Sequence, residues 1–461
     1  MNKMPTMAST CLAILPWIAI TCAFQIQTPA TLFSKRAVSS PFSTTLRHQS
    51  VTNVVDITAP RDIGPLSEWS NNWGIQTSDC FQLVSEDGVD VYAISNQNIP
   101  AESPILAIPS DIILTGNKAR EEFVDYAYNA EQMLLTSADA SDRVPQFYLF
   151  LKVLKEYEMG MDSAWYTWLN SLPRYHSNGA SMTDFCFGCL PPYAAEVSLV
   201  EKRCLRQFVQ SLSEIPFLSD RTKQNEVLTT WAFSIVHTRY FTVPNNGDVC
   251  IVPMADFFNH GGVEEEEVNI SYDDNGNCFA YSNYDITAGQ PLRICYGDPT
   301  NPSNLLARYG FLDESSPATF CKYVIPNPSQ EVLELGYDPS RMLFYNDGGI
   351  SQEVWDVLLY QELAQVSSDL AQDFYNAHIM GDVSTKQQYQ EQYFPQALVA
   401  LKNHVDFLVN ELEELSIGLE TQVDQGLDGW RHPRLGLILR HNEYVKRTFD
   451  LVQSNLDNMS F

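Results

Sequence analysis

Residues 295–312 read CYGDPTNPSNLLARYGFL and combine the signals of a strand, a turn and a helix. A strand is predicted to end at Tyr296-Gly297, because the apolar run before it gives way to a turn rich in Pro and Asn. The segment SNLLARYG has apolar residues at helical spacing and is predicted to be a helix that ends at Gly310. A Tyr-Gly pair at the end of a strand is common, so the stretch alone does not establish a function.

Two earlier segments place polar side chains in apolar surroundings. Residues 231–241 (WAFSIVHTRYF) form a predicted apolar helix that ends in Thr238-Arg239-Tyr240-Phe241. In residues 253–261 (PMADFFNHG), an apolar strand is interrupted by Asp256, Asn259 and His260. Each has a structural interpretation: Asn and His often cap a turn after a strand, and Arg often serves only as an ion-pair partner.

The rest of the chain alternates between strand-rich and helical parts. Residues 80–115 and 249–296 combine short apolar runs with turn signals, which is typical of short strands. From about 118 to 236, and from about 350 to the end, apolar residues recur at three- and four-residue spacing, which predicts helices. We therefore expect an α+β fold, in which a β-rich domain is interrupted by a helical insert and followed by an all-helical C-terminal domain.

The chain of 461 residues has a net charge of −29. Such a charge repels a polyanion, so we expect no nucleic-acid partner. It suits a partner that presents a basic segment, although solubility alone also explains many acidic proteins. The acidic run Glu264 to Glu267 is predicted to be a solvated loop, which could attract a basic peptide.

The first 55 residues contain no Asp or Glu and are predicted to be a targeting presequence. The apolar run Cys11 to Phe24 is too short to span a bilayer comfortably and is typical of a signal peptide. A basic segment rich in Ser and Thr follows, as in transit peptides. The two in series predict import into a plastid, with secretion or an endomembrane location as the alternative. No stable membrane association is expected after the presequence is removed.

The cysteines do not form a recognisable framework. Cys186-Phe-Gly-Cys189 is a lone CxxC, and no second ligand pair for zinc is apparent, so no metal is predicted. A thiol-redox role would require the motif to open a helix after a strand, whereas two prolines follow it closely here. Buried structural cysteines are the favoured interpretation.

Together, and in this order, the three segments resemble the SET-domain family, specifically the branch of Rubisco large-subunit methyltransferase that acts on non-histone proteins. That branch carries S/T-R-x-F, D-x-x-N-H and Y-G-x-x-S-N-x-x-L-L-x-x-Y-G-F segments in succession. Residues 163–173 (SAWYTWLNSLP) and 434–452 (RLGLILRHNEYVKRTFDLV) are similar to the branch's insert and to the last helix of its substrate-binding domain. The resemblance implies a SET domain at about 75–315 with a helical insert at about 118–228, and a helical substrate-binding domain at 318–461.

The resemblance also implies an activity, which is transfer of a methyl group from S-adenosylmethionine (SAM) to a lysine of a non-histone protein. Tyr296 would be the catalytic tyrosine, and Phe241 and Phe311 would bind the substrate or wall its channel. The residues implied in cofactor binding are Thr238, Arg239, Asp256, Asn259, His260, Gly88, Ser103 and Ile105. No metal is required.

Three departures leave alternatives open. The family's cofactor loop usually reads G-x-G-L, whereas this chain has Gly88-Val89-Asp90-Val91, so Asp90 could crowd the cofactor or the loop could have another shape. The chain also has Ser103 and Gln290 where the family has glutamates. An inactive SET-derived protein-binding adaptor is therefore an alternative. A histidine-directed methyltransferase is another, although that branch carries an asparagine where this chain has Phe241.

Overall fold

The computed structural model describes residues 54–244, 247–262, 265–424 and 431–459, which all belong to one structural unit, residues 52–461. The predicted presequence lies almost entirely outside the described residues. The strands are β1 (Gln76–Thr77), β2 (Phe81–Val84), β3 (Tyr92–Ser95), β4 (Pro104–Ile108), β5 (Leu114–Thr115), β6 (Tyr240–Thr242), β7 (Val249–Ile251), β8 (Asn259–His260), β9 (Val268–Tyr272), β10 (Cys278–Ser282), β11 (Arg293–Ile294), β12 (Ala318–Phe320) and β13 (Leu343–Tyr345).

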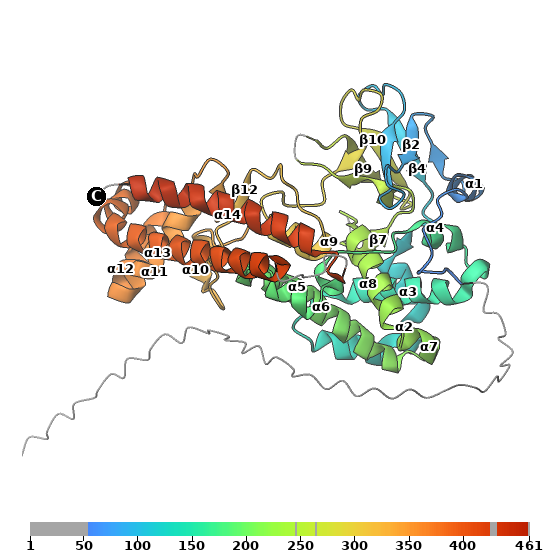
Figure 1. Ribbon diagram of the computed structural model, residues 1–461, viewed down its shortest axis with the longest axis horizontal. Coiled ribbons are helices and arrows are strands. Elements are labelled where there is room, and N and C mark those ends of the chain that lie inside the picture. The colour runs from blue at the N-terminus through green and yellow to red at the C-terminus, as the bar shows by residue number, and fades with distance from the viewer. Residues whose placement is uncertain (1–53, 245–246, 263–264, 425–430, 460–461) are drawn as a thin grey trace, which may run out of the picture. The chain divides into compact units, whose positions relative to one another are not determined.

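Strands from both sides of the helical insert pair with each other, so the β-rich part is one domain despite the insertion. The largest sheet has the order β1-β4-β10-β9, in which β4 and β10 are antiparallel and Ala107 lies opposite Phe279. Figure 1 shows these blue and yellow strands side by side. A second sheet, β5-β7-β6, joins the two ends of the insert. The short strands β8 and β11 pair in parallel, so the segment after Ile294 runs alongside the segment after His260.

The first helix after the N-terminal strands, α2, begins at Gly116. The helices are α1 (Leu66–Asn72), α2 (Gly116–Leu135), α3 (Val144–Met159), α4 (Tyr166–Ser171), α5 (Asp184–Gly188), α6 (Pro192–Ser211), α7 (Asp220–Lys223), α8 (Glu226–Arg239), α9 (Pro302–Tyr309), α10 (Gln330–Glu334), α11 (Gln352–Val366), α12 (Ser368–Ile379), α13 (Val383–Asp424) and α14 (Leu435–Asn458). The side chain of Thr115 caps α2, and that of Asn225 caps α8. Buried aromatic rings of α3, α6 and α8 pack together in the core of the insert: Phe147, Phe150, Phe208 and Phe233.

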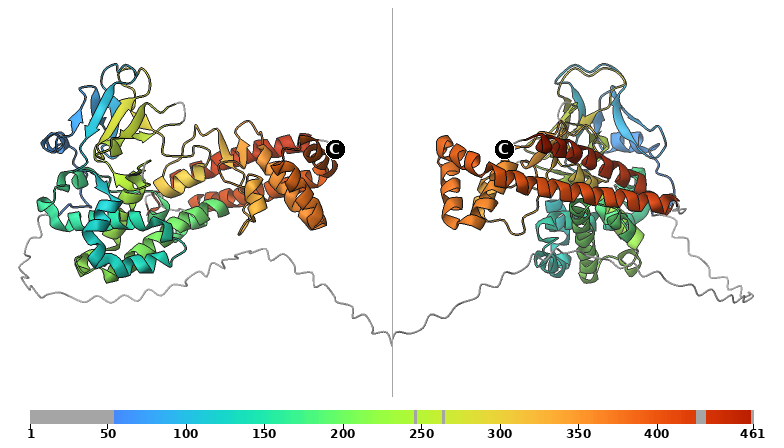
Figure 2. Two further views of the ribbon diagram at one scale, coloured as in Figure 1. Left: turned by 180° about the vertical axis from the view of Figure 1, so that it is seen from behind. Right: turned by 60° about the vertical axis from the view of Figure 1, so that its left-hand side comes forward.

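The C-terminal region is mainly helical and has a core of its own, in which α11, α13 and α14 pack together. Figures 1 and 2 show α13 and α14 lying side by side. The expected α+β class is confirmed. The region expected to be entirely helical also contains one short antiparallel pair, β12 with β13, in which Phe320 and Phe344 are buried against α14. Strands of three residues are too short to give a clear alternating pattern in the sequence.

Two other expectations concern the cysteines and the membrane. Cys186 lies in α5 and Cys189 caps its end, and both are free and buried, as expected for structural cysteines. Burial raises the pKa of the Cys189 thiol to about 12, which disfavours a reactive thiolate. Among the described residues, no helix is long and apolar enough to cross a membrane.

Candidate active site

A cavity of about 790 Å³ lies where the β-rich domain meets the insert. Its size is within the range of about 300 to 1,000 Å³ that is typical of small-molecule sites. It is walled by the loop before α1, the loop between β2 and β3, the loop after α4, the end of α8, and the segments around β8, β11 and α9. The sequence separation between these segments is up to about 250 residues, so the cavity exists only in the folded chain.

The three motifs do meet at this cavity. The predicted residues that line it are Gly88, Thr238, Arg239, Asp256, Asn259, His260, Tyr296 and Phe311. Gly88 has a φ of +75°, a conformation that glycine adopts without strain, and it forms the turn that brings the β2–β3 loop to the cavity. The ring of Phe311 packs against His260, with the ring centres 5.4 Å apart.

Two predicted cofactor residues do not reach this cavity. Ile105 lies in β4 and is buried in the core, at 1% exposure. The backbone N–H of Ser103 donates to the hydroxyl of Ser282, next to the β4–β10 pairing. The structure therefore places both residues in or beside the sheet and does not bring them together with the other predicted cofactor residues. The sequence pattern did not show which way each residue of this strand points.

Tyr296 is fixed by three hydrogen bonds. Its hydroxyl donates to the carbonyl of Phe258 at 2.7 Å, its backbone N–H donates to Nδ1 of His260 at 3.1 Å, and its carbonyl accepts from the hydroxyl of Tyr309 at 3.2 Å. The parallel pairing of β8 with β11 brings these segments together. Burial raises the pKa of Tyr296 well above its usual value, so the side chain is a neutral phenol at physiological pH.

Arg239 and Asp256 form a buried pair at the centre of the site. The Arg239 guanidinium lies 3.1 Å from Oδ2 of Asp256 and also donates to the Asp256 carbonyl. Oδ2 accepts a further hydrogen bond from the indole N–H of Trp168 at 3.0 Å. Burial raises the pKa of Asp256, and the charge of Arg239 opposes this shift. The pair joins the end of α8 to the segment before β8 and thereby links two of the three motifs.

Sequence reasoning missed three basic residues of the cavity, which are Arg61, Arg174 and His176. Arg61 donates to the carbonyls of Ser171 and Val89, at 2.7 and 3.1 Å, and so holds the β2–β3 loop. Burial and the neighbouring Arg239 lower the pKa of Arg61 to about 9, which leaves it charged at neutral pH. Arg61 lies in a segment with no motif. Arg174 and His176 directly follow residues 163–173, and that proximity was the one available signal.

Five buried polar atoms of cavity residues have no hydrogen-bond partner in the described part of the chain: Nη2 of Arg61, Nε2 of His176, Nε of Arg239, Oδ1 of Asp256 and Nε2 of His260. The last of these lies 3.5 Å from Oδ2 of Asp313. Burial and the charge of Arg239 lower the pKa of His176 to about 3, so its ring is neutral. Unpartnered buried polar groups are costly, and their concentration in one cavity is typical of a site that a polar ligand completes. The guanidinium donors suit an anionic group of that ligand, and the rings of Phe311 and Tyr309 suit a flat apolar group.

A second cavity, of about 340 Å³, is also lined by Tyr296. Its walls combine aromatic rings, among them Phe241, Tyr240 and Tyr272, with charged residues such as Arg308 and Glu266. Both cavities are lined by Tyr296 and by four other residues: Thr238, Arg239, Asp256 and Tyr309. Phe241 therefore belongs to this second cavity, whereas Phe311 belongs to the first.

The acidic run beside the second cavity differs from the prediction of a solvated loop. Glu267 is 3% exposed, and its carboxylate accepts from the backbone and guanidinium of Arg293, at 2.7 to 3.1 Å. Glu265 is exposed and also pairs with Arg293, at 2.8 Å, while Glu266 lines the second cavity. Glu264 lies outside the described residues. A run of like charges gave no sign that one member would be buried by an arginine from a neighbouring strand.

Comparisons with known proteins give a fold but no sequence relative. No protein-family model matches the chain, and no curated protein matches it significantly. Among solved structures, it is similar to the SET domain of LSMT bound to lysine and AdoHcy, with 16% identity and a TM-score of 0.60. It is also similar to Rubisco LSMT bound to AdoMet, with 16% identity and a TM-score of 0.59. Each match covers 86% of this chain and 91% of the other. The chain thus has the SET methyltransferase fold, over most of its length.

Proposed function

We propose that this protein is a SAM-dependent protein-lysine N-methyltransferase that acts on a non-histone protein. The observation that carries the proposal is the meeting of two cavities at Tyr296. Methyl transfer to an amine is an in-line displacement, so the donor and the acceptor must approach the methyl carbon from opposite sides. Two adjacent cavities that share Tyr296 and four other wall residues would let a donor in one meet an acceptor in the other. The similar structures, whose descriptions name AdoMet, AdoHcy and lysine, support the same assignment.

The residues of the first cavity fit SAM. Arg61 and Arg239 would hold its carboxylate with guanidinium donors that have no partner in the described chain. Phe311 and Tyr309 would contact the adenine ring, and Asn259 would hold a polar group of the methionine part. When bound, SAM supplies a methyl group on a positively charged sulfur. No other cofactor is needed for the transfer.

Residues of this chain would orient the lysine amine and remove the water around it. Phe241, Tyr240 and Tyr272 contribute rings to the wall of the second cavity, and these would suit the aliphatic stem of a lysine. Withdrawal of the lysine from water in this cavity would lower its pKa, so its proton would leave to water before transfer. The nitrogen lone pair then forms the new C–N bond as the C–S bond breaks, and the bonding electrons remain on sulfur. A second proton leaves the methylated nitrogen afterwards.

Tyr296 would act as an alignment group. Its hydroxyl proton is donated to the Phe258 carbonyl, so the oxygen lone pairs remain available to the reacting groups. Such a fixed dipole, held beside the reacting groups, would stabilise the charge distribution of the transition state. The aromatic side chain at position 241 favours lysine over histidine, because a phenylalanine offers no hydrogen bond to an imidazole.

The plastid location and the non-histone substrate are parts of the proposal that rest on the sequence. The predicted signal and transit-like segments support the first, and the likeness to Rubisco LSMT supports the second. A fusion of residues 1–55 to a fluorescent protein tests the location. Fluorescence in plastids is the expected result, and fluorescence in the secretory pathway would contradict it.

Calorimetry of SAM binding tests the proposed function most directly. We expect wild-type protein to bind SAM and Asn259→Ala to bind it at least about 10-fold more weakly, because a polar contact in the cavity is lost. Asn129→Ala is the matched control, since Asn129 is exposed on α2 and lies outside both cavities. Incubation with methyl-labelled SAM and a protein extract should then label lysine residues. A folded protein that binds no SAM at millimolar concentration would instead be an adaptor, and the proposal would be wrong.

A further inference from the structure

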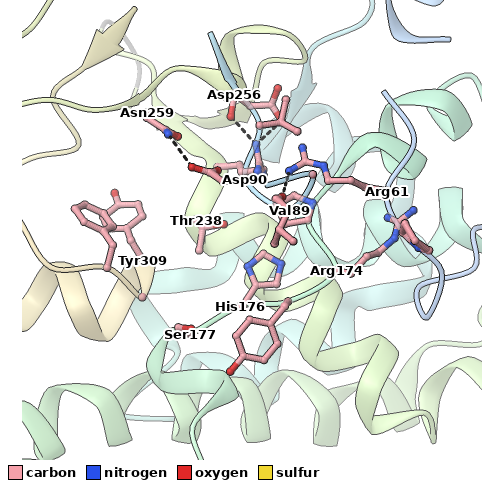
Figure 3. Close-up of a pocket in the computed structure, with 18 of the residues that line it drawn as sticks. Arg61, Val89, Asp90, Arg174, His176, Ser177, Thr238, Asp256, Asn259 and Tyr309 are labelled. Carbon is pink, nitrogen blue, oxygen red and sulfur yellow. Dashed lines mark hydrogen bonds and ion pairs between the residues drawn. The ribbon is translucent and has the colours of Figure 1, made fainter. Parts of the chain in front are cut away.

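The first cavity contains a carboxylate that the mechanism above does not use. Two acidic residues line this cavity, Asp256 and Asp90. The Asp256 carboxylate is already bound by Arg239 and Trp168. The Asp90 side chain is exposed to the cavity, and its Oδ2 lies 3.5 Å from the amide nitrogen of Asn259. Figure 3 shows the two side chains facing each other.

The loop that carries Asp90 is well fixed. The Asp87 carboxylate accepts from the backbone N–H groups of Val89 and Asp90, at 2.8 Å each. The hydroxyl of Ser85 donates to the carbonyl of Asp90, and Arg61 donates to that of Val89. These bonds use the backbone of Asp90 and leave its carboxylate available. The carboxylate is therefore held at the cavity wall without being part of what holds the loop.

The charges around Asp90 define what it could bind. Its negative charge opposes the lowering of the Arg61 pKa, so the two side chains interact electrostatically across this part of the cavity. Arg61 and Arg239 each present a buried nitrogen with no partner in the described residues, which suits an anion. A ligand that fills this region therefore needs a negative group for the arginines and a positive group for Asp90. An α-amino acid has both, one carbon apart.

We propose that Asp90 binds the α-ammonium group of the cofactor while Arg61 and Arg239 bind its carboxylate, so that the site selects a zwitterionic amino-acid end. This inference rests on the proposed function, because it concerns the same cavity and the same cofactor. Ribose hydroxyls are the other partners that a carboxylate commonly binds, but they carry no charge to match Asp90. An ammonium bound by a carboxylate forms a charge-assisted hydrogen bond, which is roughly twice as strong as a neutral one.

Asp90 could instead be a steric obstacle to the cofactor, and this role predicts the opposite effect of mutation on cofactor affinity. If Asp90 merely crowds the cavity, Asp90→Gly should tighten cofactor binding. If Asp90 binds the ammonium, Asp90→Gly and Asp90→Asn should both weaken it. Folding should not be affected, because the carboxylate of Asp90 bonds no backbone group of its loop.

The test is a calorimetric cycle with two ligands that differ only in the amino group: S-adenosylhomocysteine and its analogue with hydrogen in place of the α-amino group. We expect Asp90→Asn to weaken binding of S-adenosylhomocysteine about 10-fold, and to leave binding of the desamino analogue unchanged or tighter, because a repulsion with its carboxylate is removed. Glu86→Gln is the control. It removes the same charge from the same loop, but Glu86 does not line the cavity.

Three outcomes would overturn the inference: equal losses for both ligands, no loss for either, or tighter binding of S-adenosylhomocysteine to Asp90→Gly. Equal losses of affinity for both ligands would mean that Asp90 binds the ribose or maintains the conformation of the loop. If wild-type protein binds neither ligand, the proposed function fails as well, and this result is distinct from the other three. Thermal unfolding of each variant shows whether a loss of binding reflects a loss of folding.

Discussion

The Tyr296 hydroxyl is committed as a donor to Phe258, and burial raises the pKa of the phenol. Both facts argue that Tyr296 aligns the reacting groups and does not remove a proton. We predict that Tyr296→Phe lowers the rate of methyl transfer by about 100-fold or more, the usual effect of removing one preorganised polar group. SAM affinity should change less than about 3-fold, since the lost hydroxyl acts mainly on the transition state.

Single-turnover transfer of labelled methyl, together with calorimetry, checks this prediction. Tyr128→Phe is a matched control, because Tyr128 is an exposed residue of α2, outside both cavities. Unchanged transfer in Tyr296→Phe would remove Tyr296 from its proposed role. A similar loss of SAM affinity and of rate would mean that the phenol holds the cofactor instead.

Lys322 is an unusual residue outside the site. It is 8% exposed, its ammonium bonds the hydroxyls of Ser303 and Thr319 at 2.9 and 3.1 Å, and it lies over the ring of Tyr193 at 4.7 Å. In the described part of the chain it forms no ion pair with a carboxylate. Burial lowers its pKa from 10.5 to about 7.

This lowered pKa predicts how stability depends on pH. Between pH 7 and the unfolded pKa of 10.5, the unfolded chain binds a proton at Lys322 that the native chain does not, so the free energy of unfolding rises with pH. The slope approaches about 1.4 kcal/mol per pH unit from about half of that value at pH 7, which adds up to about 1.6 kcal/mol from pH 7 to 8.5. Urea unfolding of wild type and Lys322→Met should show this rise in the wild type alone. Lys402→Met, at the surface, is the control and should keep the wild-type slope.

At the level of the elements, the C-terminal end of α9 packs against the segment around Ser177, which forms part of the cavity wall. Gly310 has a φ of +82° and its N–H bonds the carbonyls of Leu305 and Leu306. A Cβ at this position would lie 2.5 Å from the backbone of Ser177, a residue of the cavity wall. We predict that Gly310→Ala lowers the free energy of unfolding by about 2 kcal/mol or more, because the strained φ and the clash add.

Chemical denaturation checks this prediction. Gly418→Ala is the matched control, since Gly418 lies within α13 and a Cβ there meets nothing. We expect that variant to be more stable than the wild type by up to about 1 kcal/mol, the difference in helix propensity. Equal stabilities for Gly310→Ala and wild type would show that α9 and the Ser177 segment can move apart without cost.

The elements themselves were largely predictable from the sequence. The helix before Arg239 and the helix ending at Gly310 have clear periodicity and end signals, and both are present. The cavity was only partly predictable. Arg61 approaches from a segment without a motif, and Ile105 points into the core, because both positions depend on tertiary packing. Glu267 was misjudged for the same reason, since Arg293 covers it from another strand. A motif therefore identified the site, but not all of its walls.

Across the whole described chain, hydrogen bonds from α14 and from Arg434 just before it connect the C-terminal helical region to the insert and to α9. Ser303 of α9 bonds His441 at 2.9 Å, and Asn442 donates to the carbonyl of Cys189 at 2.7 Å. Arg434, the residue just before α14, donates twice to the carbonyl of His176, at 2.7 and 3.1 Å. His176 lines the first cavity, so the C-terminal region supports part of the wall of that cavity.

This connection predicts that a change in α14 alters cofactor affinity. The Arg434 guanidinium also lies 4.6 Å from the ring of Tyr175, which lines the same cavity, so Arg434→Ala removes both supports of this wall. We expect SAM affinity to fall about 5- to 10-fold in calorimetry, because each lost charge-assisted bond costs roughly 1 to 3 kcal/mol and the loop recovers part of it by relaxing. Arg440→Ala removes an arginine from the same helix, where its pair with Glu314 is exposed and 3.8 Å long, and should leave affinity unchanged. Unchanged affinity in Arg434→Ala would show that the wall keeps its shape without the C-terminal region. A substrate that docks on α14 could then influence cofactor binding only by direct contact with the cavity.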